Sequence, residues 1–317
     1  MLKRIFTIEI VRVTEAAAIA AARLRGRGDE KAADQAAVDA MRQALNQIAD
    51  LDGLVVIGEG ERDEAPMLYI GEKVGTGGDQ KIDIALDPLE GTTLCAKAMP
   101  NSLAVIAMAE SGSLLHAPDC YMQKIAVGGG YPADVVDLDL PADENIARLA
   151  KAKGVKANQI TACILDRPRH ADLIAAVRKT GAAIKLITDG DVAGVIDTAD
   201  PDTGIDIYMG TGGAPEGVLA AAALRCIGGQ MQGRLVLKNA EERARAVKMG
   251  IADPDKKFRL EEMASGDVMF AATGVTDGSM LQGVKFHGNY ITTHTVVMRS
   301  ATNTVRWVKY RRLNDGR

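Results

Sequence analysis

Two acidic residues stand close together directly after an apolar run. Residues 82–93 read IDIALDPLEGTT, so Asp87 and Glu90 are three positions apart. Pro88 cannot donate to a sheet ladder and is expected to end the strand, which would place both carboxylates in one tight turn. Mg²⁺ and Mn²⁺ prefer such oxygen ligands. The spacing therefore favours a divalent-cation site, while a solvated acidic turn fits it equally well.

Two other acidic positions strengthen the cation interpretation. A β-branched run at residues 54–57 predicts a second strand, and Glu59 follows its carboxyl end. Asp34 lies near the expected start of a helix whose apolar residues, from Val38 to Ile48, recur at helical spacing. Ligands of open α/β sheets sit outside the carboxyl ends of strands. Because like charges repel, a shared cation explains why acidic residues stand at all three element ends.

Two segments of the second half could bind an anion. Glycine-rich residues 210–213 join an expected strand to an Ala-rich helix with Glu216 in its first turn. The free N–H groups of that turn can donate hydrogen bonds to an anion, and Glu216 can either cap the helix or reach a metal. Arg167 and Arg169 flank Pro168 after another expected strand. Paired arginines can hold a phosphate, although two arginines after a strand are also common on ordinary surfaces.

Weaker candidates have structural alternatives. The turn Asp189–Gly190–Asp191 can bind sugar hydroxyls or a metal, or simply cap a helix. The phenol of Tyr121 can donate to a phosphate or pack against its neighbours. The histidines have no metal-binding spacing and are interpreted as structural or surface residues; they are His116, His170, His287 and His294.

Composition excludes several classes of function. A net charge of -4 and an aromatic content of 3% argue against nucleic-acid binding, which needs basic surfaces and stacking rings. No apolar run reaches the length of a membrane span, and charged residues interrupt the N-terminal segment, so neither a membrane partner nor a signal peptide is expected. The four cysteines form no CxxC pair, which favours reduced thiols in a cytoplasmic protein.

The length of 317 residues allows two domains. Helices in the first 50 residues precede a set of mostly antiparallel strands, with a further helix expected over residues 66–73. From about residue 143, strands and helices alternate, a pattern typical of an α/β layer with parallel strand pairs. We place the domain boundary near residue 150.

Longer motifs carry a resemblance to a known family. Residues 58–75, GEGERDEAPMLYIGEKVG, closely resemble the signature of class II fructose-1,6-bisphosphatases. Residues 87–92, DPLEGT, resemble the DPxDGT motif of the wider lithium-sensitive phosphatase superfamily, with Glu90 at the second acidic position. Residues 189–191 and 212–217 match that family in order and spacing. The resemblance extends from about residue 7 to residue 310.

The resemblance implies a two-domain αβαβα layered sandwich of the α/β class, with a metal-binding phosphatase domain at 1–150 and a sugar-phosphate-binding domain at 151–317. It implies metal ligation by Asp34, Glu59, Asp87, Glu90 and Glu216, with the carbonyl of Leu89 as a further candidate. It implies substrate contacts by Glu90, Gly91, Thr92, Tyr121, Arg167, Pro168, Arg169, Asp189, Gly190, Asp191 and Gly213. One departure is that Glu30, followed by Lys31, stands where some members carry lysine.

The expected activity is Mg²⁺- or Mn²⁺-dependent hydrolysis of the 1-phosphate of fructose 1,6-bisphosphate in gluconeogenesis or the Calvin cycle. Phosphoryl transfer needs charge neutralisation and an in-line water. Thr92, with the carboxylates Glu59 and Asp63, is our candidate for orienting and deprotonating that water. Arg167 and Arg169 would hold the distal 6-phosphate, which favours a bisphosphate as substrate.

Three alternatives stay open at this point. The same motifs fit a sedoheptulose-1,7-bisphosphatase or an enzyme that accepts both sugar bisphosphates. An inositol monophosphatase shares the superfamily chemistry. A sugar-phosphate sensor without activity would keep the fold, but every candidate ligand position holds an intact Asp or Glu. We also expect a homo-oligomer, either a dimer or a tetramer.

Overall fold

The computed structural model describes residues 1–60 and 67–314. The chain forms two compact units: unit 1 comprises Met1–Leu114 and Ser265–Arg317, and unit 2 comprises Leu115–Ala264. The boundary expected near residue 150 lies inside a helix of unit 2, α4 (Ala142–Lys153). The difference arises because the C-terminal strands pair with strands near the N-terminus, and no local sequence pattern reports such distant pairing.

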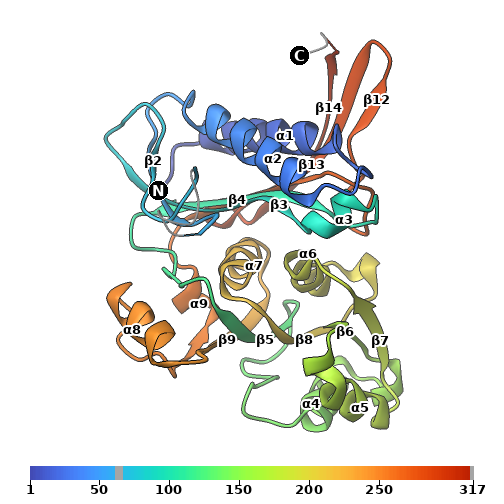
Figure 1. The fold of residues 1–317 in the computed structure, drawn as a ribbon. Helices are drawn as coiled ribbons and strands as arrows, with labels where there is room; N and C mark the ends of the chain where they lie inside the picture. Colours follow the sequence, from blue (N-terminus) through green and yellow to red (C-terminus); the bar gives the residue numbers. More distant parts are fainter. Residues whose placement is uncertain (61–66, 315–317) are drawn as a thin grey trace. The chain divides into compact units, whose positions relative to one another are not determined.

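Unit 1 is a mixed sheet with two long helices lying side by side over one face (Figure 1). Its helices are α1 (Phe6–Ala22), α2 (Glu30–Leu45) and α3 (Thr92–Ala96). Its strands are β1 (Asp52–Ile57), β2 (Lys73–Val74), β3 (Lys81–Glu90), β4 (Leu103–Glu110), β11 (Val268–Gly274), β12 (Lys285–His287), β13 (Tyr290–Arg299) and β14 (Thr304–Leu313). The strand order is β12-β13-β11-β4-β3-β1-β2, with β14 paired to β13 and only β1 and β3 parallel among these pairs.

Strand alternation separates the core of unit 1 from its acidic residues. Ile82, Ile84 and Leu86 alternate along β3 and join residues of α1 and α2 in one buried cluster. Asp83 and Asp87 occupy the intervening positions, so their side chains lie on the opposite face of the sheet. The helices therefore fix β3 from one side, and the other side carries the carboxylates.

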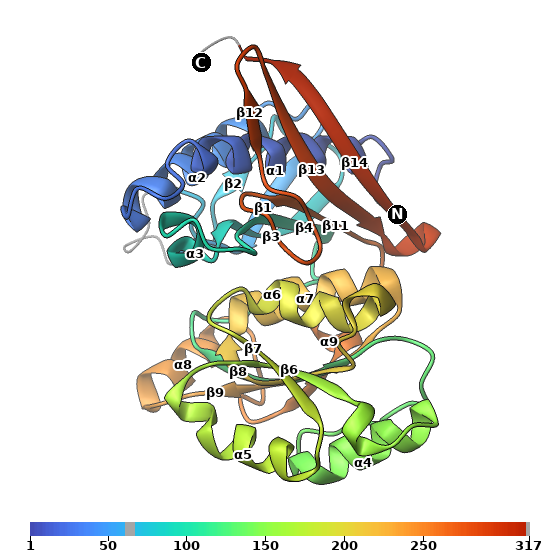
Figure 2. The same cartoon turned by 90° about the vertical axis from the view of Figure 1, so that its right-hand side faces the viewer.

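Unit 2 is a second mixed sheet with helices on both faces; Figure 2 shows α4 and α5 on one face and α6 and α7 on the other. Besides α4, its helices are α5 (Ala171–Lys179), α6 (Asp191–Ile196), α7 (Ala214–Ile227), α8 (Ala240–Lys248) and α9 (Leu260–Met263). Its strands are β5 (Tyr121–Val127), β6 (Thr161–Leu165), β7 (Ala183–Ile187), β8 (Ile207–Gly213), β9 (Gln230–Val236) and β10 (Lys257–Arg259). The order is β10-β9-β5-β8-β6-β7, and β6 is parallel to both β7 and β8.

The α/β fold class is confirmed. Unit 1 contributes one helix layer and one sheet, and unit 2 contributes a sheet between two helix layers. The parallel pairs expected after residue 143 are those of β6 with its two neighbours. No helix among the described residues is both long and apolar enough to cross a membrane.

Three local expectations differ from the structure. Strand β3 continues through Pro88 to Glu90, because its register with β4 shifts after Asp87 and the proline lies in this irregularity, where no ladder donor is needed. Residues 67–72 form turns rather than a helix. Helix α2 begins at Glu30, capped by Asp29, whose Oδ1 accepts from the Ala32 N–H at 3.0 Å, so Asp34 lies one turn inside the helix.

We expect Ile10→Ala to destabilise the protein through the α1 contact with the sheet. Ile10 is fully buried, and an Ile→Ala change at such a position costs about 2–5 kcal/mol of unfolding free energy. Ile8→Ala, on the same helix at 42% exposure, is the matched control and should change stability by less than about 0.5 kcal/mol. Urea unfolding followed by circular dichroism measures both; equal losses would contradict this packing arrangement.

Candidate active site

The irregularity at the end of β3 brings two carboxylates together. Carboxylate oxygens of Asp87 and Glu90 lie within 4.8 Å of one another. Glu90 is buried at 4% exposure and Asp87 is half-buried. The backbone N–H of Leu89 donates to Asp87 Oδ1 at 2.9 Å, which fixes that carboxylate within the turn. The pair supplies hard oxygen donors at the separation that a single divalent cation can bridge.

The residues after this pair are held by a left-handed glycine. Gly91 has φ +76°, and a Cβ there would lie 2.9 Å from Leu94 Cδ1, so a side chain would be both strained and crowded. Thr92 then begins α3. The hydroxyl of Ser102 on the neighbouring segment donates to the Glu90 carbonyl at 3.1 Å. Thr92 therefore has a fixed place two residues after Glu90, at the start of α3.

Asp34 is half-buried on α2, and burial raises the pKa of its carboxyl. The loop before this helix is tied to α3 by backbone hydrogen bonds from Gly26 N–H to the Cys95 carbonyl and from Gly28 N–H to the Ala96 carbonyl, each at 2.9 Å. The segment leading into α2 is thus anchored to the helix that follows the DPLEGT turn. A nearby cation would favour the ionised form of Asp34, which burial disfavours.

The structure does not bring all the expected metal ligands of unit 1 into one group. Among the described residues, neither Asp34 nor Glu59 is included with the carboxylates that lie within 4.8 Å of Asp87 and Glu90. Glu59 is half-buried just beyond β1, and its N–H donates to the Leu68 carbonyl at 3.1 Å. Asp63, our other candidate base, lies outside the described residues.

In unit 2, sheet pairing brings the anion-binding candidates to one end of the sheet. Tyr121 at the start of β5 lies opposite Gly213 at the end of β8. The guanidinium of Arg169 lies 4.8 Å from the centre of the Tyr121 ring and donates twice to the Thr211 carbonyl, at 2.9 and 2.7 Å. Lys238 Nζ also lies over this ring, at 4.7 Å. Two cations against one phenol form a positive cluster suited to a phosphate.

His170 locks the arginine segment onto β8. Its Nδ1 lies 2.8 Å from the Leu165 carbonyl, and its Nε2 accepts from the Thr211 N–H at 2.8 Å, which assigns the proton to Nδ1. Burial lowers the pKa of His170, with a further contribution from the neighbouring Arg169 and Arg167. The structural interpretation of this histidine accounts for these contacts, since a neutral ring fixes the short 3₁₀ turn Pro168–His170.

The Asp189–Asp191 turn leads into α6, and contacts of Asp191 hold it against the sheet. Gly190 adopts φ +83° as the N-cap of α6. Asp191 is buried and forms an ion pair with Lys124 of β5, and it also accepts from the Tyr208 hydroxyl at 3.2 Å. Lys124 was not among the sequence candidates. The sequence did hold a signal for it. Met122, Lys124 and Ala126 alternate along β5 and share one face of the strand, so the lysine stands where its two apolar neighbours face the core.

Glu216 occupies the first turn of α7, as the sequence indicated. Its carboxylate lies against Gly213, where an added Cβ would collide with it. Gly213 is the N-cap of the helix, and its lack of a side chain leaves room for the Glu216 carboxylate in this position. The sequence gave no reason to select Lys238, whose role depends on β9 ending beside Tyr121.

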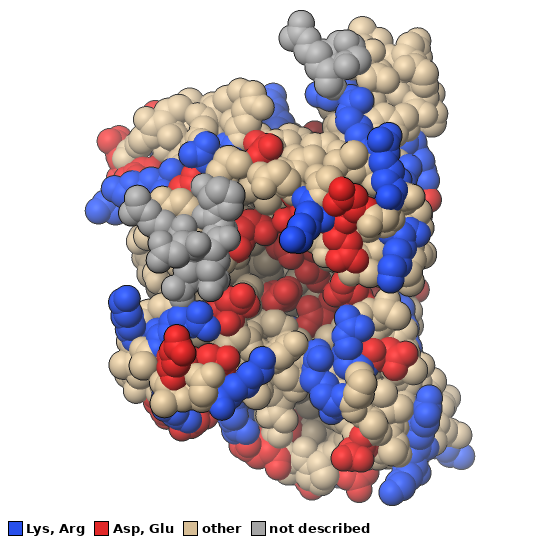
Figure 3. Space-filling view, viewed as in Figure 1, with Lys and Arg blue, Asp and Glu red and all other residues tan. Residues whose placement is uncertain are grey.

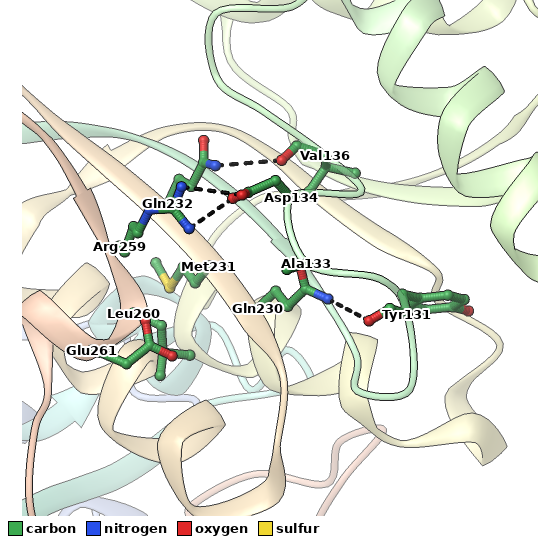
Figure 4. A pocket seen from close by; sticks show the side chains of 10 residues that line it. All are labelled: Tyr131, Ala133, Asp134, Val136, Gln230, Met231, Gln232, Arg259, Leu260 and Glu261. Carbon is green, nitrogen blue, oxygen red and sulfur yellow. Dashed lines mark hydrogen bonds and ion pairs between the residues drawn. The ribbon is translucent and has the colours of Figure 1, made fainter.

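A cavity of about 240 Å³ in unit 2 lies away from these residues. Its lining includes Gln230, whose register partner Val127 is at the opposite end of β5 from Tyr121. Figure 4 shows that polar groups of the lining bond one another: Arg259 pairs with Asp134, and Gln232 donates to the Val136 carbonyl at 3.4 Å. The candidate anion-binding residues of unit 2 therefore lie at the Tyr121 end of the sheet and not at this cavity.

The sequence carries 38 lysine and arginine residues and 42 aspartate and glutamate residues. On the face shown in Figure 3, acidic side chains are interspersed with lysine and arginine side chains, several of which follow one another along the upper right-hand edge. Two further positive charges, Arg169 and Lys238, lie against Tyr121.

Comparison with known proteins gives a consistent result. A relative from Synechococcus sp. (strain JA-3-3Ab), named D-fructose 1,6-bisphosphatase class 2/sedoheptulose 1,7-bisphosphatase, is 48% identical over 334 residues, covering 98% of this chain and 96% of the relative. A protein of the same name from Synechococcus sp. (strain JA-2-3B'a(2-13)) has the same identity and coverage. Fructose-1,6-bisphosphatase 1 class 2 from Escherichia coli (strain K12) is 45% identical over 322 residues, covering 97% and 95%.

The family match spans both units. Residues 4–312 match the family described as bacterial fructose-1,6-bisphosphatase, glpX-encoded. This range includes the DPLEGT turn of unit 1 and the GGAPEG segment of unit 2, and it confirms the resemblance drawn from those motifs. The chain belongs to the family of bacterial, glpX-encoded fructose-1,6-bisphosphatases.

Proposed function

We propose that this protein hydrolyses the 1-phosphate of fructose 1,6-bisphosphate, giving fructose 6-phosphate and inorganic phosphate. Its family and its relatives are named for this phosphatase reaction, and the chain is accordingly a phosphatase. The observation that carries the proposal is the pair Asp87 and Glu90, held within 4.8 Å where the family's phosphatase motif occurs. Gluconeogenesis or the Calvin cycle is the expected context.

The acidic pair supports metal dependence, and we propose Mg²⁺ or Mn²⁺ as the ion. Ligands would come from Asp34, Glu59, Asp87, Glu90 and Glu216, with the Leu89 carbonyl as a further donor. Oxygen-only donors suit either hard cation. A bound cation of this kind neutralises phosphate charge and lowers the pKa of a bound water. Glu216 belongs to unit 2, and its place in this ligand set rests on the resemblance.

The protein's own groups divide the remaining work. Thr92 stands two residues after Glu90. We propose that Thr92, with Glu59 and Asp63, orients and deprotonates the attacking water. Backbone and side-chain groups of Gly91 and Glu90 contact the substrate beside it. Positioning of this kind is the larger part of catalysis in phosphoryl transfer.

The positive cluster around Tyr121 would bind the phosphate that does not react. Arg167 and Arg169 flank Pro168 on the turn fixed by His170, and Arg169 already lies against the Tyr121 ring. The turn Asp189–Asp191 and the backbone of Gly213 would contact the sugar. This assignment favours a bisphosphate, because a monophosphate leaves the arginine cluster without an anion.

Sedoheptulose 1,7-bisphosphate is the second candidate substrate. Both Synechococcus relatives carry the sedoheptulose 1,7-bisphosphatase name, whereas the Escherichia coli relative carries only the fructose name. Inositol monophosphate is disfavoured by its lack of a second phosphate. A homo-oligomer and a cytoplasmic location stay predictions; free thiols at all four cysteines agree with a reducing compartment.

A substrate panel tests the activity. Purified protein with Mn²⁺ or Mg²⁺ should release phosphate from fructose 1,6-bisphosphate and not from fructose 6-phosphate or inositol 1-phosphate, and EDTA should abolish release. Sedoheptulose 1,7-bisphosphate, measured in parallel, decides between single and dual specificity. The absence of phosphate release from both sugar bisphosphates with either ion would overturn the proposal in favour of a sugar-phosphate sensor.

Arg169→Ala should weaken substrate binding more than it slows turnover. A contact with the non-reacting phosphate serves the ground state and the transition state alike, so KM should rise by roughly tenfold or more while kcat changes little. Arg178→Ala, an exposed arginine on the adjacent α5, is the control and should leave both constants unchanged. Steady-state kinetics give the answer; a fall in kcat at constant KM would place Arg169 near the reacting phosphate.

A further inference from the structure

A lysine in the interior of unit 2 joins three segments of the proposed site. Lys124 is only 1% exposed, and its ammonium forms an ion pair with Asp191 at the start of α6. The same ammonium donates to the Gly213 carbonyl at 2.9 Å, directly before α7. Its aliphatic stem runs beside Gly217 of α7, where an added Cβ would lie 3.3 Å from Lys124 Cδ. One side chain thus contacts the ends of α6, β8 and α7.

The neighbouring backbone is shaped to admit this ion pair. A Cβ at Gly212 would collide with the Asp191 carboxylate and would lie 2.9 Å from Lys124 Nζ. The hydroxyl of Tyr208, on β8, donates to the same carboxylate at 3.2 Å. Glycine at 212 and the phenol at 208 therefore both serve the pair.

Stability alone is a poor reason for this arrangement. Removing two charges from water is costly, and well-packed apolar residues of similar volume often stabilise a protein as much as a buried ion pair does. A buried, hydrogen-bonded pair does restrict geometry, because each partner must stay where the other can reach it. What the Lys124–Asp191 pair restricts is the spacing between the 189–191 turn and the Gly213–Glu216 segment.

We infer that Lys124 and Asp191 are positioning residues that hold the sugar-binding turn and the Glu216-bearing start of α7 in one arrangement. Asp191 then acts through its ion pair, and the substrate contacts of this turn come from Asp189 and the Gly190 backbone. Lys124 also fixes the carbonyl of Gly213, whose Cα lies against the Glu216 carboxylate. This inference rests on the proposed function, since it assigns both segments to one substrate site.

Replacing both charges separates positioning from folding. Lys124→Met alone should lower the melting temperature, because it leaves the Asp191 carboxylate buried without its cation. The double variant Lys124→Met with Asp191→Leu should recover most of that loss. It should still show kcat/KM for fructose 1,6-bisphosphate reduced by roughly 10- to 100-fold, mainly through KM, as is typical when groups that orient ligands are removed.

A matched pair in unit 1 provides the control. Arg299 and Asp267 are also buried, at 4% and 8% exposure, and form an ion pair outside the proposed site. Arg299→Met with Asp267→Leu should affect melting temperature in the same way and leave KM at the parent value. Asp191→Asn, which keeps volume and one acceptor oxygen for the Lys124 ammonium, is the variant to use if the double variant fails to fold. It leaves the buried Lys124 without its counter-ion, so it should lower the melting temperature as well as raise KM.

Two readouts distinguish failure of this inference from failure of the proposed function. Calorimetric titration with fructose 1,6-bisphosphate in EDTA, where turnover is blocked, should show weaker binding by the double variant than by the parent. Mn²⁺ titration should show a higher half-saturating concentration. A folded double variant, or a folded Asp191→Asn variant, with parental KM and parental binding would overturn the positioning role. A parent protein that neither binds nor hydrolyses the bisphosphate would overturn the proposed function instead.

Discussion

The electrostatic repulsion between Asp87 and Glu90 is the constraint on which the proposed chemistry depends. If both carboxylates are ionised, two unit charges within 4.8 Å of each other repel by about 3 kcal/mol or more at an effective dielectric of about 20. The fold holds them there nonetheless, through the irregular end of β3, the Leu89 N–H and the buried surroundings of Glu90. In our proposal, a divalent cation would offset this repulsion, and the placement of the two carboxylates would then favour binding of the ion. The helices α1 and α2 supply the rigidity, because they pack on the opposite face of the strand.

In unit 2, neutral and paired buried groups hold the loops that carry the candidate residues. Its candidate residues come from separate loops, and each loop is tied to the sheet by a buried polar side chain. His170 fixes the arginine turn to β8, and Lys124 fixes the 189–191 turn to the neighbouring strand β5. Charged groups that we propose as substrate contacts, such as Arg169, can then remain exposed without losing their positions. Positioning by buried groups and binding by exposed ones is a division expected where orientation limits the reaction.

Much of this arrangement could be predicted from the sequence, and the failures have identifiable causes. The repeat of Val38, Met41 and Leu45 located α2, but the cap at Asp29 placed its start four residues earlier than expected. Pro88 indicated a strand end, yet an irregular register accommodates it within β3. The return of β11 to β4 involves pairing across more than half of the chain, which no local pattern contains. Lys124 is a charged residue at a core position of β5 and could have been selected from the sequence. Lys238 could not, because its place beside Tyr121 depends on the pairing of β9 with β5.

The central claim is that the Asp87–Glu90 pair binds a divalent cation required for phosphatase activity, and metal binding by an Asp87→Asn variant tests it most directly. Ligand binding at about 100 times the dissociation constant stabilises a native state by roughly 2.7 kcal/mol, which a thermal melt resolves. Our account predicts that Mn²⁺ raises the melting temperature of the parent, and that Asp87→Asn retains the ion-free fold, shows a smaller Mn²⁺-induced shift and loses phosphate release. A variant with the parent's metal-induced shift and full activity would contradict the account.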